Sequence, residues 1–466
     1  MKQKIYVISG GTVQHVAPHF AVCAPAYGTV GGDLAGIINN YFYTHLDPNI
    51  AEKYEVFYLK TRMTGRHHSI FEEGILEQAG LKHLETNEDI DKLVDFLISK
   101  KDTRCIFMAS ALCDFKPFFG TDIKDKGENI VAFGKSVPRL SSANNKVIEF
   151  EPTKKIIDKI RKERKDIFLV TFKTTAGATK EESYTKALSN LKRSSSNLVF
   201  VNDIREHHNA VVTPEEFPYW SNSREEALTN LIYMTMKRLE LSFDRTVVLD
   251  PEMRFMISDW SDKSPTKIPD NFKKIMEYLV ERKAFKPFNG KTAGHFGCKI
   301  LETGFALEHK GKNLPAIRLC SRRKMDHNKI FDKGEGLGII YGKDETGNIL
   351  ATGGKPSVGE HTQDMIYDKF GDKVHSIVHF HSPLKVEDHP KIPQESQKEF
   401  ECGSRECGLN TRKGMRELFP GIYAVHLKGH GPNIAFSKEV DHQDIINFIE
   451  NHWDLDNKTG GILGKS

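Results

Sequence analysis

The sequence predicts an α/β protein made of two domains, and three observations carry that prediction. The first is an apolar strand near the start of the chain, followed by glycine-rich turns and a helical segment. The second is the alternation of strand-like and helix-like segments up to about residue 238, which favours a parallel, doubly wound sheet. The third is a change after residue 270 to short strands punctuated by glycine.

The bulk composition is that of a globular protein in a reducing compartment. The chain has 466 residues, which predicts two or three domains. Its net charge of +4, with 28% charged residues, is too balanced to indicate nucleic acid as a partner. Its 7 cysteines are scattered and do not form the pattern of a disulfide framework. We expect no signal peptide and no membrane span, because no long apolar run is present. The scattered cysteines indicate a cytoplasmic protein.

The first half opens as an open α/β sheet does, with strand, glycine turn and helix. We expect a strand over residues 4–8 and a helix over residues 33–42, because apolar runs flank the glycines. Further strands are expected over 55–59, 105–110, 167–172 and 198–202, and helices over 89–99, 152–162, 180–192 and 224–238. The polar segment 120–145 is expected to be a lid or a dimerisation arm.

The second half follows a segment rich in acids, prolines and serines. We therefore expect a first domain over 1–245, a linker over 246–270 and a second domain over 271–466. Helices are expected over 271–282, 363–370 and 440–452, and strands over 295–301, 304–308, 316–320, 336–341, 374–381, 422–427 and 433–436. The tail from residue 457 is rich in glycine and lysine and is expected to fray.

The run Ser9-Gly10-Gly11-Thr12 directly follows the first strand. Backbone N–H groups of such a turn can hold phosphate, and the threonine hydroxyl can assist. The run lacks the Gly-x-Gly-x-x-Gly pattern, which disfavours an NAD site. A tight structural turn is the alternative interpretation.

Four motifs, taken together, point to a family. They are Ile8 to Thr12, Met108-Ala-Ser-Ala-Leu-Cys-Asp-Phe115, Leu169-Val-Thr-Phe-Lys173 and Leu198-Val-Phe-Val-Asn-Asp203. Their order resembles the phosphopantothenate–cysteine ligase (phosphopantothenoylcysteine synthetase) family over residues 1 to about 215. The resemblance implies a Rossmann-like domain that uses CTP or ATP with Mg²⁺ to activate a carboxylate, as in coenzyme A biosynthesis. It places the nucleotide near Gly10, Gly11, Thr12, Asp114, Phe172 and Asn202.

The same resemblance names one catalytic cation and shows two departures. Lys135 falls where the family has a lysine-rich motif, and by that resemblance would neutralise charge in the nucleotidylate-forming step. The family's asparagine that handles the acyl intermediate is Ala24 here, and a family lysine is Thr29. The domain would then act on a different acid, or keep binding without ligation. Lys173 and Lys192 are either part of this chemistry or solvated lysines.

Three histidines in the second half have the pattern of a metal site. His379 and His381 lie two apart in an apolar, β-prone run, so their side chains share one face of a strand. His430 lies in Gly429-His430-Gly431 and would supply a third ligand, leaving an open position as catalytic metal sites do. Core or surface histidines at a strand end are the alternative interpretation.

The surroundings of these histidines resemble a second family. The loop from Gly354 to Glu360, the helix ending in Ile366-Tyr367, the His379-Phe380-His381 strand and the later His430-Gly431 together resemble the class II aldolase/adducin family, over about 272–453. The resemblance implies an α/β domain with a central, mostly antiparallel sheet. It implies that His379, His381 and His430 bind Zn²⁺, or alternatively Mn, Fe or Co, as a Lewis acid.

The catalytic carboxylate implied by this resemblance is Glu360, as general acid/base, although Gly359 occupies the strict position. The alternative is that Glu360 only caps the following helix. The segment Gly294–Cys298 falls where the family binds phosphate but lacks that loop's residues. Cys402 and Cys407 form a Cys-x4-Cys pair that either lines the site or supplies redox or metal chemistry.

These observations predict a bifunctional enzyme that acts on small molecules, with a ligase-like half and a metal-dependent lyase-like half. Alternatively, the aldolase-like half is a non-catalytic oligomerisation or binding module and only the ligase-like half is active. In the reverse case only the aldolase-like half is active. Both resemblances imply a homo-oligomer, dimer or tetramer. From the balanced charge and the lack of a long apolar run we expect neither a nucleic acid nor a membrane as partner.

Overall fold

The computed structural model describes residues 2–44, 51–65, 74–118, 133–140, 142, 148–256, 260–261, 263–288, 290–332 and 336–457. Its contacts divide the chain into two compact units. The first unit comprises Met1–Pro214 and Pro218–Thr235, and the second comprises Glu215–Phe217 and Met236–Ser466. Most of the expected lid or arm at 120–145, and the expected frayed tail after residue 457, lie outside the described residues. No described helix combines the length and the apolar character that crossing a membrane requires.

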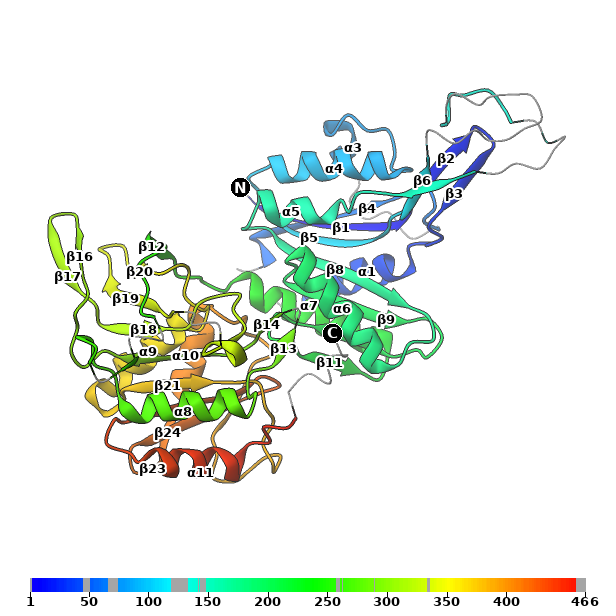
Figure 1. The fold of residues 1–466 in the computed structure, drawn as a ribbon. Coiled ribbons are helices and arrows are strands. Elements are labelled where there is room, and N and C mark those ends of the chain that lie inside the picture. Colours follow the sequence, from blue (N-terminus) through cyan, green and yellow to red (C-terminus); the bar gives the residue numbers. More distant parts are fainter. Residues whose placement is uncertain are drawn as a thin grey trace. The chain divides into compact units, whose positions relative to one another are not determined.

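The first unit is built on a seven-stranded, mainly parallel sheet, as the sequence predicts (Figure 1). The strand order is β11-β10-β9-β8-β5-β1-β4. The five parallel strands are β4 (Tyr54–Lys60), β1 (Gln3–Gly11), β5 (Thr103–Ala111), β8 (Phe168–Thr175) and β9 (Leu198–Asp203). An antiparallel hairpin that the sequence analysis missed, β10 (Asn209–Val212) and β11 (Pro218–Ser221), extends the β9 edge.

Helices cover both faces of this sheet (Figure 1). They are α1 (Thr29–Thr44), α3 (Ile75–Gln78), α4 (Asn87–Ser99), α5 (Ile157–Glu163), α6 (Lys180–Ser194) and α7 (Arg224–Leu239). Alternate residues of β1 are buried on opposite faces, and Tyr6 and Ile8 pack with α4 and α5. Two short hairpins, β2 (Val13–Ala17) with β3 (Phe20–Cys23) and β6 (Phe115–Pro117) with β7 (Phe150–Pro152), lie outside the main sheet.

The second unit is built on a ten-stranded, mostly antiparallel sheet, as expected. The strand order is β12-β20-β19-β18-β15-β21-β25-β24-β22, with β23 paired to β24. The strands are β12 (Thr246–Asp250), β15 (His295–Lys299), β18 (Arg318–Cys320), β19 (Gly338–Lys343), β20 (Ile349–Thr352), β21 (Ser376–His379), β22 (Gln394–Ser396), β23 (Arg416–Phe419), β24 (Ile422–Lys428) and β25 (Gly431–Phe436). Two further hairpins, β13 (Pro287–Phe288) with β14 (Lys291–Thr292) and β16 (Ala306–His309) with β17 (Lys312–Pro315), stand apart from it.

The presence of β12 corrects one expectation. The segment 246–270, expected to be a linker, begins with a strand that pairs in parallel with β20 of the second unit. No residue of Thr246–Asp250 is fully buried, so its strand character depends on pairing with β20 rather than on a local pattern of burial. The boundary between the two compact units lies instead within α7, between Thr235 and Met236.

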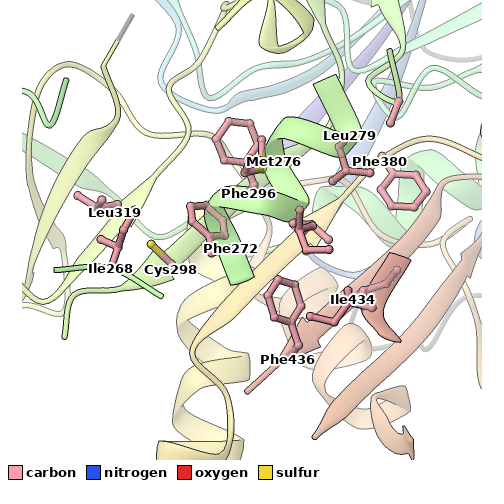
Figure 2. Close-up of a cluster of buried hydrophobic side chains, with 14 of the residues drawn as sticks. Ile268, Phe272, Met276, Leu279, Phe296, Cys298, Leu319, Phe380, Ile434 and Phe436 are labelled. Carbon is pink, nitrogen blue, oxygen red and sulfur yellow. The ribbon is translucent and has the colours of Figure 1, made fainter. Parts of the chain in front are cut away.

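The sheet of the second unit has an apolar layer on each face. On one face α8 (Asp270–Glu281) and α11 (His442–His452) pack over a large core, and Figure 2 shows Phe272, Met276 and Leu279 of α8 within it. On the other face lie α9 (Glu360–Phe370) and, beside it, α10 (Arg405–Gly414). Within β21, Val378 belongs to the first layer and Ile377 to the second. His379, two residues after Ile377, therefore faces the α9 side.

Candidate functional site

The structure brings His379, His381 and His430 together. All three side chains are buried, and a potential ligand atom of each lies within 4.8 Å of those of the other two. Nε2 of His379 is 3.3 Å from Nε2 of His430. Two nitrogens bound at 2.0–2.1 Å to a tetrahedral ion would lie about 3.3 Å apart. The three residues therefore fit a divalent metal ion.

The glycines beside His430 allow this approach. Gly431 has φ 146°, and a Cβ there would lie 2.1 Å from the carbonyl oxygen of Phe380. Gly429 has φ 74° and packs against the ring of Phe217. A side chain at residue 431 would collide with the backbone of Phe380, and a side chain at residue 429 would collide with the ring of Phe217. The Gly-His-Gly run thus holds His430 against His379.

Burial keeps the imidazoles of His379 and His430 neutral, because it lowers the pKa of both. It lowers the pKa of His379 to about 4. Burial first, and then the neighbouring His379, lowers the pKa of His430 well below its ordinary value. Neutral imidazoles keep a nitrogen lone pair, which a metal ion needs.

A fourth histidine, His295, was not among the sequence candidates. It pairs with His379 across β15 and β21, and their ring centroids are 4.7 Å apart. Its Nδ1 is 2.8 Å from Nε2 of Gln363 on α9. The only sequence signal was its place in Gly294–Cys298, which was compared with a phosphate loop but forms most of a buried strand.

Gly359 explains how His295 reaches this position. A Cβ on Gly359 would lie 2.0 Å from Cδ2 of His295, so the imidazole fills the space that a side chain at residue 359 would need. The aldolase/adducin resemblance would put a carboxylate at residue 359. In this structure the imidazole of His295, which comes from β15, fills the space beside that residue.

Glu360 is paired with Arg318. It is the first residue of α9, is fully buried, and accepts a hydrogen bond from Arg318 at 2.7 Å. Arg318 also binds Asp364 at 2.7 Å. Burial raises the pKa of Glu360 even though the charge of Arg318 opposes the shift. The helix has no side-chain cap, so the capping alternative is not seen, and the acid/base role of Glu360 stays a prediction.

The cysteine pair lies beside the histidines. Sγ of Cys402 is 3.4 Å from Nε2 of His430. Cys407 lies in the first turn of α10, and its sulfur accepts a hydrogen bond from Nε2 of Gln397 at 3.1 Å. Both cysteines are free thiols. The Cys-x4-Cys pair therefore lies beside the histidine cluster.

The first unit has a cavity of about 590 Å³ at the carboxyl ends of its parallel strands. Three predicted nucleotide residues, Asp114, Phe172 and Asn202, line it together. The lining also includes the segment Ala24–Gly31 and four cationic side chains, Lys155, Lys173, Arg193 and Arg224. The carboxyl edge of an open parallel sheet is where such folds bind ligands.

The other predicted nucleotide residues have structural contacts. The hydroxyl of Thr12 donates to Oδ1 of Asn87 at 2.6 Å and accepts from the amide of Cys113 at 2.9 Å. Gly10 has φ 99°, and a Cβ there would lie 2.2 Å from the hydroxyl oxygen of Thr61. The amide of Gly11 donates to the carbonyl of Ala26 at 2.7 Å. None of the three is among the described residues that line the cavity.

Lys135 does not line the cavity either, within the described part of the chain. Its ammonium is 2.7 Å from Oε2 of Glu85. Burial alone would raise the pKa of Glu85, but the hydrogen bond and charge of Lys135 leave it below the ordinary value. In this structure Lys135 thus neutralises a carboxylate of the protein, and its catalytic role stays a prediction.

Comparisons with known proteins reach only part of the chain. No protein-family model matches it. A stretch of 122 residues, 26% of this chain, is 28% identical to the coenzyme A biosynthesis bifunctional protein CoaBC of Thermococcus kodakarensis, and it covers 27% of that protein's length. The match therefore spans only about a quarter of the relative.

Solved structures are similar to this chain only at a low level. A DNA/pantothenate metabolism flavoprotein from Streptococcus pneumoniae has a TM-score of 0.38 and 16% identity, covering 50% of this chain and 96% of that chain. The C-terminal domain of a CoaBC protein has a TM-score of 0.35 and 15% identity, covering 50% and 94%. None of these relatives supports the class II aldolase/adducin resemblance, which stays a prediction. About a quarter of the chain is thus similar in sequence to a CoaBC protein.

Proposed function

We propose that the first unit binds CTP or ATP with Mg²⁺ and uses it to activate a carboxylate for attack by an amine. The observation that carries this proposal is the cavity in which Asp114, Phe172 and Asn202 meet four cationic side chains. Cations beside a nucleotide neutralise the phosphates and the charge that develops during transfer. The sequence similarity to a coenzyme A biosynthesis protein supports the same reaction class.

The contacts of the residues that line the cavity suggest which part of the ligand each of them binds. Lys155 is ion-paired with Asp114, and Arg193 binds Asp158 at 2.7 Å, so both cations are partly neutralised by the protein. Lys173 is half-buried at the end of β8, next to Phe172. We assign Lys173 to the phosphates and the ring of Phe172 to the apolar part of the ligand. Ala24 and Thr29, which also line the cavity, replace the polar family residues for the acyl group, so the acid differs from phosphopantothenate.

Calorimetric titration with CTP and ATP tests this proposal, followed by pyrophosphate release with a panel of acids that includes phosphopantothenate. We expect binding by the full chain, weakened by Lys173→Ala and unchanged by Lys192→Ala, which removes a lysine outside the described cavity lining. If neither CTP nor ATP binds, the proposal is overturned. Binding without pyrophosphate release from any acid would restrict it to nucleotide binding.

We further infer that the second unit is a metal-dependent enzyme of the lyase or epimerase type. The observation that favours this second function is the buried triad His379, His381 and His430. A divalent ion held there would supply a Lewis acid that polarises a carbonyl oxygen. The protein supplies neutral imidazoles, a fixed orientation for His379, and surroundings from which water is largely excluded.

Hydroxycarbonyl substrates test this second function. Cleavage, epimerisation or dehydration by the metal-loaded chain should disappear in His381→Ala and persist in His375→Ala, a histidine upstream in the same segment. Metal binding without any such activity would favour the alternative of a non-catalytic module. We also propose that the chain is a homo-oligomer, dimer or tetramer, which light scattering on the full chain checks.

A further inference from the structure

The second unit has a cavity of its own, of about 470 Å³, whose described lining does not include the histidine cluster. The cavity is formed by the segment 243–245 before β12, the turn between β19 and β20, and residues of α9 and α10. Cavities of about 300–1,000 Å³ are the size that binds small molecules. The cavity therefore has room for a ligand that neither the metal centre nor the nucleotide cavity accounts for.

The lining of this cavity has an excess of positive charge. Its four cationic side chains are Arg245, Lys343, Arg405 and Arg412, and its two carboxylates are Asp244 and Asp368. Arg405 and Arg412 lie seven residues apart on α10, so they share one face of that helix. Like charges gathered around one cavity repel each other and attract an anion.

The arginines of the lining are available to a ligand, whereas its lysine is not. Lys343 is ion-paired with Asp364, a buried residue of α9. By contrast, the guanidinium groups of Arg245, Arg405 and Arg412 form neither an ion pair nor a hydrogen bond within the part of the chain that the structure describes. A guanidinium binds a phosphate or a carboxylate through two parallel N–H groups. The three arginines are thus the groups that would hold an anion.

The neutral polar side chains of the lining are already used by the protein. The hydroxyl of Thr346 donates to Oδ1 of Asp344 at 2.7 Å, and the side-chain amide of Asn348 donates to Oδ2 of the same carboxylate at 3.0 Å. These bonds hold the turn between β19 and β20. Recognition in this cavity therefore depends on charge more than on neutral hydrogen bonds.

Two exposed apolar side chains lie in the same lining. Phe243 is 51% exposed and Leu409 is 45% exposed. Met365 of α9, which is half-buried, also lines the cavity. An apolar group of a ligand would remove these side chains from water, which is favourable.

We propose that this cavity binds a small organic anion with an apolar body. Arg245, Arg405 and Arg412 would hold its phosphate or carboxylate group, and Phe243 and Leu409 would contact its apolar part. Phosphate esters and carboxylic acids share this chemistry. The site is separate from the proposed metal centre and from the proposed nucleotide cavity, so its existence does not depend on either.

Fluorescence titration of the full chain with 1-naphthyl phosphate, 1-naphthoate and the neutral 1-naphthol tests the proposal. We expect at least one of the two anions to bind, and 1-naphthol to bind about tenfold more weakly or less. The double variant Arg245→Ala/Arg412→Ala should weaken anion binding by about tenfold or more. Circular dichroism verifies that each variant is folded.

Two control variants show where the anion binds. Arg416→Ala removes an exposed arginine of β23 outside the described lining, and Lys173→Ala removes a cation of the cavity in the first unit. Neither should change the affinity for the naphthyl anions. A loss in Arg416→Ala as large as that in the double variant would overturn the proposal, because general positive charge would then explain the binding.

The remaining outcomes decide the proposal as follows. Binding of only 1-naphthyl phosphate assigns the site to phosphate esters, and binding of only 1-naphthoate assigns it to carboxylic acids. Equal binding of 1-naphthol would overturn the recognition of charge. Anion binding that is unchanged in the double variant, or lost in Lys173→Ala, would place the ligand elsewhere and overturn the site, as would a failure of both anions to bind.

Discussion

Nδ1 of His379 lies 2.7 Å from the carbonyl oxygen of Pro432. Because a carbonyl oxygen only accepts hydrogen bonds, that nitrogen must carry the hydrogen, and the neutral ring presents Nε2 with a free lone pair. Nε2 is the atom that faces His430. A backbone carbonyl on β25 thus selects the tautomer of His379 that can bind a metal ion, as carbonyls behind ligating histidines commonly do.

The neutral buried histidines predict a loss of stability in mild acid. Burial lowers the pKa of His379, His327 and His426 to about 4, whereas in the unfolded chain each titrates near about 6.5. Between these values the unfolded chain binds protons that the folded chain does not, so stability is present above about pH 6.5 and falls as the pH approaches about 4. Thermal melts of the metal-free protein across this window check the direction.

His327 offers a way to isolate one of these groups. It is buried against the rings of Phe285 and Phe296. We expect His327→Phe to reduce the pH dependence by roughly one proton. Melting temperatures that are flat between about pH 6.5 and about pH 4, in the wild type, would contradict the neutral state of the buried imidazoles.

Gly359→Ala should disturb the metal centre without touching a ligand. The new methyl group would overlap the imidazole of His295, whose ring centroid lies 4.7 Å from that of His379. We expect a loss of about 1–3 kcal/mol in unfolding free energy, from overpacking, together with weaker metal binding. Urea unfolding and metal titration measure the two effects.

Gly36→Ala is the matched control for that substitution. Gly36 lies in α1, and a Cβ there meets nothing within 4 Å. Alanine should therefore be neutral or stabilising by up to about 1 kcal/mol. If Gly359→Ala behaves like Gly36→Ala, the close packing of His295 against residue 359 is wrong.

Arg238→Ala should destabilise the chain strongly. Removing one partner of a buried ion pair leaves Glu215 as an uncompensated buried charge, at a cost of about 3–5 kcal/mol. Arg282→Ala, which breaks a half-exposed pair with Glu450, should cost at most about 1 kcal/mol. Denaturant unfolding compares the two, and equal effects would contradict the special position of the Glu215–Arg238 pair.

Thr12→Val separates a structural residue from a nucleotide-binding one. Its hydroxyl is buried and bonded to Asn87 and to the amide of Cys113, so its loss should cost about 1–3 kcal/mol of stability. Because Thr12 does not line the described cavity, nucleotide affinity should stay unchanged while Lys173→Ala lowers it. A loss of nucleotide binding at full stability in Thr12→Val would restore the role that the family resemblance assigned to it.

The sequence predicts the features that depend on local pattern. The alternation of apolar strands and amphipathic helices predicted the parallel sheet of the first unit. The i, i+2 spacing of His379 and His381 predicted two histidines that lie together, although β21 ends at His379 and His381 follows the strand. The sequence did not reveal features that depend on distant segments. His295 reaches the triad only because β15 pairs with β21, and β12 is a strand only beside β20.

The partners of charged residues also could not be predicted from the sequence. Lys135 and Glu360 carry side chains suited to catalysis, and nothing adjacent in sequence reveals their partners. Glu85 lies 50 residues from Lys135, and Arg318 lies 42 residues from Glu360. A charged residue's partner is decided by the fold, so the residue type alone did not distinguish a structural ion pair from a catalytic group.

The metal content of the purified chain tests the central claim most directly. Elemental mass spectrometry should find about one divalent ion per chain in the wild type, almost none in the double variant His379→Ala/His381→Ala, and the wild-type amount in His375→Ala. Absence of bound metal in the wild type, even after incubation with zinc, cobalt, iron and manganese, would contradict the account of the second unit as a metal centre.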